Sequence, residues 1–179
     1  VFDTRAGNTV SLGEHFFIQL KSHRKAKWET KRVFGRYNVE RSPLQVNPDD
    51  AREIQVVAEP LSRGELQLAR SMGPATPLVL VVADTGNSTL HWVCLNDFVD
   101  KVLIPEVADL SSRAKHTVHL PRWNKVAQED SALIPLRFFA RRAKLYAAFN
   151  RFRYHRHEVQ RATDDYSALE GRPGAEEEL

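Results

Sequence analysis

Cysteine and long apolar runs are scarce in this sequence. Cys94 is its single cysteine, which excludes an internal disulfide framework and a zinc site built from several cysteines. No apolar run reaches the roughly 18 residues that a membrane-spanning helix needs. A P-loop, a G-x-G-x-x-G stretch and a G-x-S-x-G elbow are also missing, so nothing favours nucleotide binding or serine-hydrolase chemistry. We expect Cys94, which lies in an apolar segment, to be a buried structural thiol.

The composition is that of an ordinary globular domain. Of 179 residues, 42% are apolar and 27% are charged, which predicts one folded domain with a hydrophobic core. The apolar fraction is too high for a chain that is disordered throughout. With no secretory signal in view, the composition favours a cytoplasmic protein that does not associate with membranes.

Charge is distributed unevenly, although 26 Lys and Arg against 23 Asp and Glu leave a net charge of only +3. The bases gather in two stretches, and the acidic residues gather around 49–50 and in the C-terminal tail. Either basic stretch by itself is more typical of a solvated surface, but the polarised pattern as a whole favours a polyanionic partner. The bases of the two stretches are Arg24, Lys25, Lys27, Lys31, Arg32 and Arg36, and then Arg137, Arg141, Arg142, Lys144, Arg151, Arg153 and Arg156.

Hydrophobic periodicity and turn residues predict a mixture of strands and helices. We expect a fold of the α/β (α+β) class, built on one mixed sheet with flanking helices and a long C-terminal helix. The predicted domains are a core over 1–121, a linker and long basic helix over 122–162, and an acidic tail with little order over 163–179. The predicted elements are a hairpin over 1–22, a ribbon around 33–39, strands at 53–58, 78–83, 89–95 and 115–120, and helices at 62–72, 96–103 and 134–160.

Local signals are strongest in the middle of the chain. Ser62 and Glu65 have the spacing of a capping box at the start of the first helix. Gly73 follows that helix as a stop signal. The run at 78–83 is apolar without interruption, which is typical of a central strand buried on both faces.

The two later helices carry their own expectations. We expect the helix at 96–103 to be capped by Asn96 or Asp97 and to end before Pro105. The long helix has an apolar stripe at helical spacing, which we expect to dock on the sheet and leave the arginines exposed. The stripe consists of Phe138, Leu145, Phe149, Phe152 and Val159.

The segment from 15 to 22 alternates in a way that predicts a half-buried strand. Phe16, Ile18 and Leu20 share one face, which we expect to face the core, and Gln19 and Lys21 share the other. An acid or amide two residues before a lysine is typical of a metal-dependent nuclease site. Oxygen ligands suit Mg²⁺, and the lysine can position the attacking water and offset charge on the phosphate. The Leu20 carbonyl is a further candidate ligand, and an exposed polar face is the other interpretation of so short a pattern.

Longer stretches carry a resemblance to a known family. The strings FFIQLKS, TPLVLVVAD and LHWVCLNDFV follow one another after a hairpin. In this order of landmarks, residues 1–121 resemble the domain of unknown function family 4365, of the PD-(D/E)XK or restriction-endonuclease-like superfamily. The resemblance implies a restriction-endonuclease-like sheet and a nuclease that depends on Mg²⁺ or Mn²⁺. Domains that resemble this one often act as effectors of prokaryotic defence against phages or plasmids, attached to or operated by another module.

The resemblance assigns roles to two positions. Gln19 matches the second acid-or-amide position of the family, and Lys21 matches its catalytic lysine. We expect the family's first metal-binding Asp to lie upstream of Val1. Asp3 is a poor substitute, because a hairpin folded about 8–11 places it nearer the turn than the site. On this basis we expect the chain by itself to bind metal weakly.

The residues that follow Lys21 are candidates for phosphate contacts, and a solvated loop is an equal alternative. These candidates are Ser22, His23, Arg24, Lys25 and Lys27. The sequence as a whole predicts a Mg²⁺- or Mn²⁺-dependent endonuclease that hydrolyses DNA or RNA phosphodiesters. Two alternatives stay open: a catalytically inactive module of the same fold that binds nucleic acid or a protein partner, and an interaction domain whose long helix forms a homo-oligomer through its Phe stripe.

Overall fold

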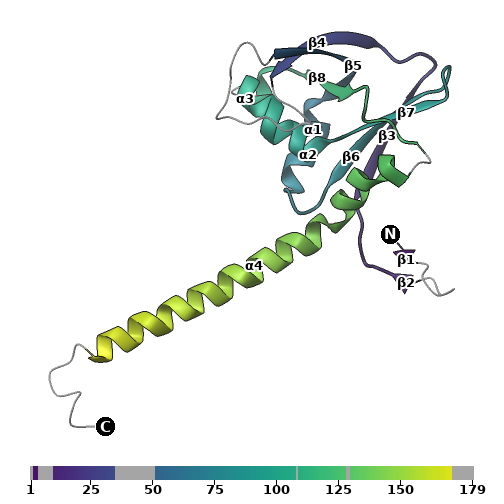
Figure 1. Cartoon of the computed structure of the whole chain (residues 1–179). Coiled ribbons are helices and arrows are strands. Elements are labelled where there is room, and N and C mark those ends of the chain that lie inside the picture. The colour runs from purple at the N-terminus through teal and green to yellow at the C-terminus, as the bar shows by residue number, and fades with distance from the viewer. Residues whose placement is uncertain (1, 4–9, 35–50, 108, 128–129, 171–179) are drawn as a thin grey trace. The chain divides into compact units, whose positions relative to one another are not determined.

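The computed structural model (Figure 1) describes residues 2–3, 10–34, 51–107, 109–127 and 130–170. The chain divides into two compact units, 1–142 and 143–179. Its strands are β1 (Phe2–Asp3), β2 (Val10–Ser11), β3 (Phe17–His23), β4 (Trp28–Phe34), β5 (Ala51–Ser62), β6 (Leu78–Asp84), β7 (Thr89–Cys94) and β8 (Lys115–Pro121). Its helices are α1 (Arg63–Ser71), α2 (Leu95–Phe98), the π-helical η3 (Val99–Leu103), α3 (Ile104–Glu106), the 3₁₀ turn η4 (Leu110–Ser112) and α4 (Asp130–Glu170). This content confirms the predicted α+β class.

The first three-stranded sheet has the order β3-β6-β7, with β6 in its centre (Figure 1). β3 runs parallel to β6, with Gln19 opposite Leu80, and β7 runs antiparallel to β6. Strands in parallel pairing are usually buried on both faces, which explains the unbroken apolar run of β6. Every residue of β6 is buried except Ala83, which is partly buried, so the predicted central strand is confirmed.

The second three-stranded sheet has the order β4-β5-β8 and is antiparallel throughout. The prediction of one sheet is therefore wrong, because β3 to β8 divide between two three-stranded sheets and β1 and β2 form a separate two-stranded one. β5 is longer at both ends than the predicted strand at 53–58. The ribbon predicted around 33–39 overlaps the end of β4, and the rest of it lies outside the described residues.

The main hydrophobic core joins both sheets to α1 and to the helical segment from α2 through η3. β5 and β8 supply Leu61 and Leu120, while β6 supplies Leu80, and each of these side chains is fully buried. α1 supplies Leu66, which is also fully buried. Burial of a leucine side chain stabilises the folded state by roughly 1.5–3 kcal/mol, so this shared core fixes where the two sheets meet.

The predicted hairpin between the first strand and the strand at 15–22 is wrong. β1 pairs instead with β2, with Phe2 opposite Ser11. β3 pairs with β6, starting where the Phe17 amide donates to the Pro77 carbonyl at 2.9 Å. The physical reason is that β6 is apolar and buried. Its backbone N–H and C=O groups all find hydrogen-bond partners only when a strand lies along each of its two edges.

α1 begins as predicted. The Ser62 hydroxyl accepts a hydrogen bond from the Glu65 amide at 3.3 Å, and the Glu65 carboxylate accepts one from the Ser62 amide at 2.7 Å. A cap of this kind stabilises a helix by about 1 kcal/mol. After the helix ends, Gly73 adopts a φ of 71°, which glycine reaches without steric penalty. The capping box and the stop signal are both confirmed.

The helix predicted over 96–103 has a different start and end. α2 continues through η3 into α3, so Pro105 lies inside the helical segment rather than beyond it. Proline is tolerated there because it stands in the first turn of α3. Asn96 is not a cap, because its side-chain oxygen accepts a hydrogen bond from the Leu78 amide at 2.7 Å. Asp97 is not a cap either, because its carboxylate is bound by an arginine of α4.

α4 is longer than predicted and continues into the segment that we expected to have little order. Its buried side chains include Phe139, whose ring packs edge-on against Trp92 with 5.7 Å between centroids. The predicted stripe is exposed instead, with Phe149 at 66% and Phe152 at 67%. Within the first unit the predicted docking of Phe138 is wrong, because the helix turns the neighbouring Phe139 toward the apolar cluster of β6 and β7.

Candidate functional site

The two faces of β3 have opposite surroundings. Gln19 and Lys21 lie on the predicted common face and are partly buried. The other face does not form the predicted core, since Ile18 is 60% exposed and Leu20 is 64% exposed. Only Phe16, just before the strand, packs on the apolar cluster. The reason is that β3 is the edge strand of its sheet, while the first turns of α4 cover β6 and β7.

Gln19 and Lys21 converge on one carboxylate. The Gln19 amide nitrogen and the Lys21 ammonium each donate to Oε1 of Glu65 at 2.6 Å. The other oxygen of Glu65 accepts hydrogen bonds from the amide and the hydroxyl of Ser62, both at 2.7 Å. The capping residue of α1 therefore also links that helix to β3. The side chains of Lys21 and Glu65 keep 34% and 26% of their surface exposed, so solvent and ligands reach them.

The Glu65 carboxylate is held in its ionised form. Burial by itself would raise its pKa, but the hydrogen bonds from Lys21 and Ser62 outweigh burial and lower the pKa to about 2. At neutral pH the site therefore holds a carboxylate and an ammonium in contact. The site thus presents an anionic oxygen and a hydrogen-bonding cation side by side.

The Leu20 carbonyl points toward the open edge of β3. The Phe17 amide donates to the Pro77 carbonyl at 2.9 Å. The His23 carbonyl accepts from the Thr85 amide at 2.9 Å. Because the backbone groups of successive residues alternate in direction along a strand, those of Leu20 face away from β6. No other strand among the described residues pairs with that edge, so the Leu20 carbonyl is accessible as a ligand.

A second acid–base pair continues the polar row of β3. His23 lies two residues beyond Lys21, and its Nε2 is 2.7 Å from a carboxylate oxygen of Glu59 on β5. Only 6% of the Glu59 side chain is exposed, compared with 43% for His23. A buried carboxylate needs such a partner, since an unpaired one would lose its hydration without compensation. Of the predicted phosphate ligands, His23 is therefore the one whose side chain pairs with a buried carboxylate.

The oxygen donors at this site form a mixed set. They are the Glu65 carboxylate, the side-chain oxygen of Gln19 and the Leu20 carbonyl. Mg²⁺ in phosphoryl-transfer sites is commonly held by one or two carboxylates, with waters and substrate phosphates as its other ligands, and this set fits that pattern. Among the described residues, no three His, Cys, Asp or Glu side chains gather in a group that could hold a metal ion. The predicted Mg²⁺ or Mn²⁺ therefore depends on one carboxylate and two neutral oxygens.

The other predicted phosphate contacts lie at the end of β3 and in the turn that follows. Ser22, Arg24 and Lys25 are exposed. The Lys27 side chain is 75% exposed and forms an ion pair with Glu29 at 2.6 Å. Exposed ion pairs contribute about 0–1 kcal/mol, so Lys27 is easily drawn to another anion. Arg24, Lys25 and Lys27 therefore lie on one accessible turn, whereas Ser22 lies within β3, on the face opposite Lys21.

Two buried groups outside this site have shifted pKa values. Burial and the nearby Asp97 raise the pKa of Cys94 to about 11, so the thiol stays protonated and unreactive at neutral pH. The predicted burial of Cys94 is confirmed. Burial, and then the Lys31 ammonium 3.1 Å from its Nδ1, lower the pKa of His119 to about 4. His119 is therefore neutral over the physiological range.

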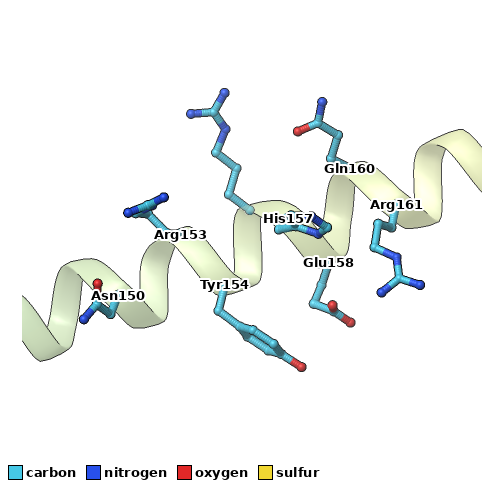
Figure 2. A pocket seen from close by; sticks show the side chains of 8 residues that line it. Asn150, Arg153, Tyr154, His157, Glu158, Gln160 and Arg161 are labelled. Carbon is cyan, nitrogen blue, oxygen red and sulfur yellow. The ribbon is translucent and has the colours of Figure 1, made fainter.

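A shallow hollow on α4 is lined by that helix alone. Figure 2 shows its side chains standing out from successive turns between Asn150 and Arg161. All of them are exposed. Binding sites for small molecules usually enclose most of the ligand, and a single helix surface does not, so we assign this hollow no function.

Sequence reasoning misses two acids of the site. The spacing from Ser62 explains Glu65 fully as a capping residue, so no further signal points to its contact with β3. Glu59 offers a weak signal, because it occupies a position of β5 that alternation with Val57 and Leu61 assigns to the core. A carboxylate at such a position is seldom fully buried unless it is paired.

No family model, curated protein or solved structure matches this chain. The resemblance to the domain of unknown function family 4365 therefore stays a prediction. Among the described helices, none has both the length and the apolar character that crossing a bilayer requires.

Proposed function

We propose that the chain forms the core of a nuclease that depends on Mg²⁺ or Mn²⁺ and hydrolyses nucleic-acid phosphodiesters. The observation that carries the proposal is the convergence of Gln19 and Lys21 on Glu65, with both distances at 2.6 Å. Metal-assisted phosphodiester hydrolysis requires a cation and oxygen ligands held on rigid elements, here a strand and a capped helix. The exposed bases after β3 support a nucleic acid as the substrate.

Each residue of the site has a distinct role in this proposal. Glu65, Gln19 and the Leu20 carbonyl would hold the metal ion, which supplies Lewis acidity toward a phosphate oxygen when bound. The Lys21 ammonium orients the attacking water and offsets negative charge on the phosphate. Glu65 also acts as a positioning residue, because its carboxylate fixes where the Lys21 ammonium lies.

The proposal is tested by cleavage of plasmid DNA and of labelled RNA with Mg²⁺ or Mn²⁺. We expect EDTA to abolish cleavage and Lys21→Ala to lower kcat by about 100-fold or more, because the transition state loses its cation. Glu65→Gln, which keeps the shape but removes the charge, should have a similar effect. Lys115→Ala, at an exposed lysine of β8, is the matched control and should cleave as the wild type does. Cleavage that persists in EDTA or in Lys21→Ala would sink the proposal.

A catalytically inactive module that binds nucleic acid is the second candidate function. Two features of the Lys21–Glu65 pair favour it. The Lys21 ammonium is already neutralised by Glu65, and Glu65 is the one carboxylate that Gln19 and Lys21 contact among the described residues. In that case the same mixtures show salt-dependent binding and no cleavage. A role in prokaryotic defence and a regulatory partner rest on the resemblance alone.

A further inference from the structure

Two segments far apart in the sequence are anchored to the β6–β7 end of the first sheet. The turn after β3 is held where the Gly86 amide donates to the Arg24 carbonyl at 2.9 Å. The approach is so close that a Cβ atom at Gly86 would collide with that carbonyl oxygen. The segment after β8 is held where the Trp92 amide donates to the Asn124 carbonyl at 2.9 Å. Side chains reinforce both contacts, because the Asp84 carboxylate accepts from the Ala26 amide and the Asn124 side chain donates to the Trp92 carbonyl, each at 3.1 Å.

His91 of β7 lies between these two segments. Its ring meets the ring of Trp28 edge to face, with 5.0 Å between centroids. On its other side, Lys125 forms a β-bridge with His91. Burial, together with the charges of Lys125 and Arg122, lowers the pKa of His91. The buried His91 therefore contacts both Trp28, which follows the turn after β3, and Lys125 of the segment after β8.

The exposed side chains of these two segments are bases and indoles. Among the described residues, Arg24, Lys25, Arg122 and Lys125 form no ion pair with a carboxylate. Unpaired cations at such density repel one another and attract a polyanion. We name this region the basic–aromatic surface, and it consists of Arg24, Lys25, Lys27, Trp28, Arg122, Trp123 and Lys125, all of them exposed.

Trp123 distinguishes this surface from a simple basic patch. Its side chain is 52% exposed and lies between Arg122 and Asn124 in the segment after β8. Trp28, on the other segment, is 37% exposed. An exposed indole among cations provides a flat face on which a nucleobase stacks, with a contribution of about 1–3 kcal/mol per base. A base inside a duplex is already stacked on its neighbours and cannot use such a face.

We propose that the basic–aromatic surface binds single-stranded nucleic acid, with the cations on its phosphates and a base stacked on Trp123. This inference rests on the proposed function only in taking nucleic acid as the ligand. Binding at this surface needs neither the metal nor Lys21, so the two proposals fail or stand separately.

The test is fluorescence anisotropy of a labelled 20-nucleotide oligo-dT and of a duplex of equal length, in EDTA. We expect the single strand to bind more tightly than the duplex. Trp123→Ala should weaken single-strand binding by about tenfold or more, which corresponds to loss of one stacked base, while Trp123→Phe retains most of the affinity. Arg122→Ser and Lys125→Ser should each reduce the salt dependence of binding by about 0.7 in log–log slope. Arg113→Ser, at an exposed arginine elsewhere, is the matched control.

Three results would overturn the inference. They are equal affinity for single strand and duplex, unchanged binding in Trp123→Ala, and no binding to either nucleic acid. If Trp123→Ala lowers the midpoint of unfolding, its weaker binding reflects a folding defect. The affinity of Trp123→Phe for oligo-dT is then the deciding measurement. If the chain binds oligo-dT through Trp123 but cleaves nothing, the surface stands and the proposed nuclease fails. If Trp123→Ala cleaves nucleic acid and also binds oligo-dT as tightly as the wild type, the nuclease stands and this surface fails.

Discussion

The two halves of α4 contain the same kinds of residue but have opposite surroundings. Within the first unit, Phe139 is 3% exposed and Arg142 is 8% exposed. In the second unit, Phe152 is 67% exposed, and its arginine neighbours are exposed as well. Phenylalanines and arginines occur in both halves, so residue type does not decide burial. Burial is decided by whether another element offers the helix a complementary surface.

Arg142 shows what such a surface provides. Its guanidinium donates two hydrogen bonds of 2.6 Å to the two carboxylate oxygens of Asp97. The same guanidinium lies over the Phe139 ring, 4.7 Å from its centroid. Two charges that are both removed from water depend on each other, because loss of either one leaves the other buried without its closest partner.

The largest expected effect is that of Arg142→Ala. We expect it to lower the free energy of unfolding by about 3 kcal/mol, because the buried Asp97 loses both short hydrogen bonds and keeps only the Lys101 ammonium, at 3.9 Å. The measurement is urea unfolding followed by circular dichroism. Arg151→Ala, in the exposed half of the same helix, should change stability by less than about 0.5 kcal/mol. Similar losses in the two variants would mean that the halves do not differ in their contacts.

Phe139→Ala should have an effect almost as large. We expect a loss of about 3 kcal/mol, because the substitution leaves a cavity beside Trp92. Phe138→Ala is a control of the same chemistry at the preceding position, where the side chain is 53% exposed, and it should lose far less. If Phe138→Ala proves the more harmful variant, the rotation of the helix is the one predicted from the sequence stripe.

The pH dependence of stability separates buried from exposed histidines. The pKa of His119 is about 4 in the folded chain, against 6.5 for the free side chain. Between these values the unfolded chain binds the extra proton, so stability falls as the pH is lowered from 6.5 to 4, by roughly 1–2 kcal/mol. Unfolding of His119→Gln across this range should show a flatter curve. His155→Gln, on the exposed part of α4, should keep the slope of the wild type, and an unchanged slope in both variants would contradict the assignment.

The smallest expected effect is that of Phe152→Ala. We expect a change below about 0.5 kcal/mol at low protein concentration, because an exposed ring leaves no cavity when it is removed. Light scattering at several concentrations is the accompanying measurement. A mass that doubles with concentration in the wild type but not in Phe152→Ala would show that a second copy covers the stripe.

Local signals in the sequence are sufficient to predict β6, β7 and the capping box of α1. The apolar run of β6 and the spacing of Ser62 and Glu65 each act over a few residues, so neighbouring residues reveal them. The pairing of β3 with β6 is a long-range choice, and the alternation of Ile18 and Leu20 gives no indication that their face stays uncovered. The position of Phe139 rather than Phe138 in the core depends on a surface that only the folded sheet presents.

The candidate site also has one part that the local sequence predicts and another that depends on the fold as a whole. Period-two alternation places Gln19 and Lys21 on one face of β3, and the structure confirms that placement. Glu65 reaches them only because the long β5 turns directly into α1, and nothing in the local sequence specifies that approach. An ion pair between residues 44 positions apart follows from the fold as a whole.

The contact between Gly86 and the Arg24 carbonyl has a consequence for how this chain tolerates change. Any side chain at position 86 would push apart two turns that the Gly86 amide, the Thr85 hydroxyl and the Asp84 carboxylate hold together. The exposed bases around Arg24 meet no such restriction. Substitutions can therefore change the charge around Arg24 without moving the turn, whereas position 86 admits only glycine.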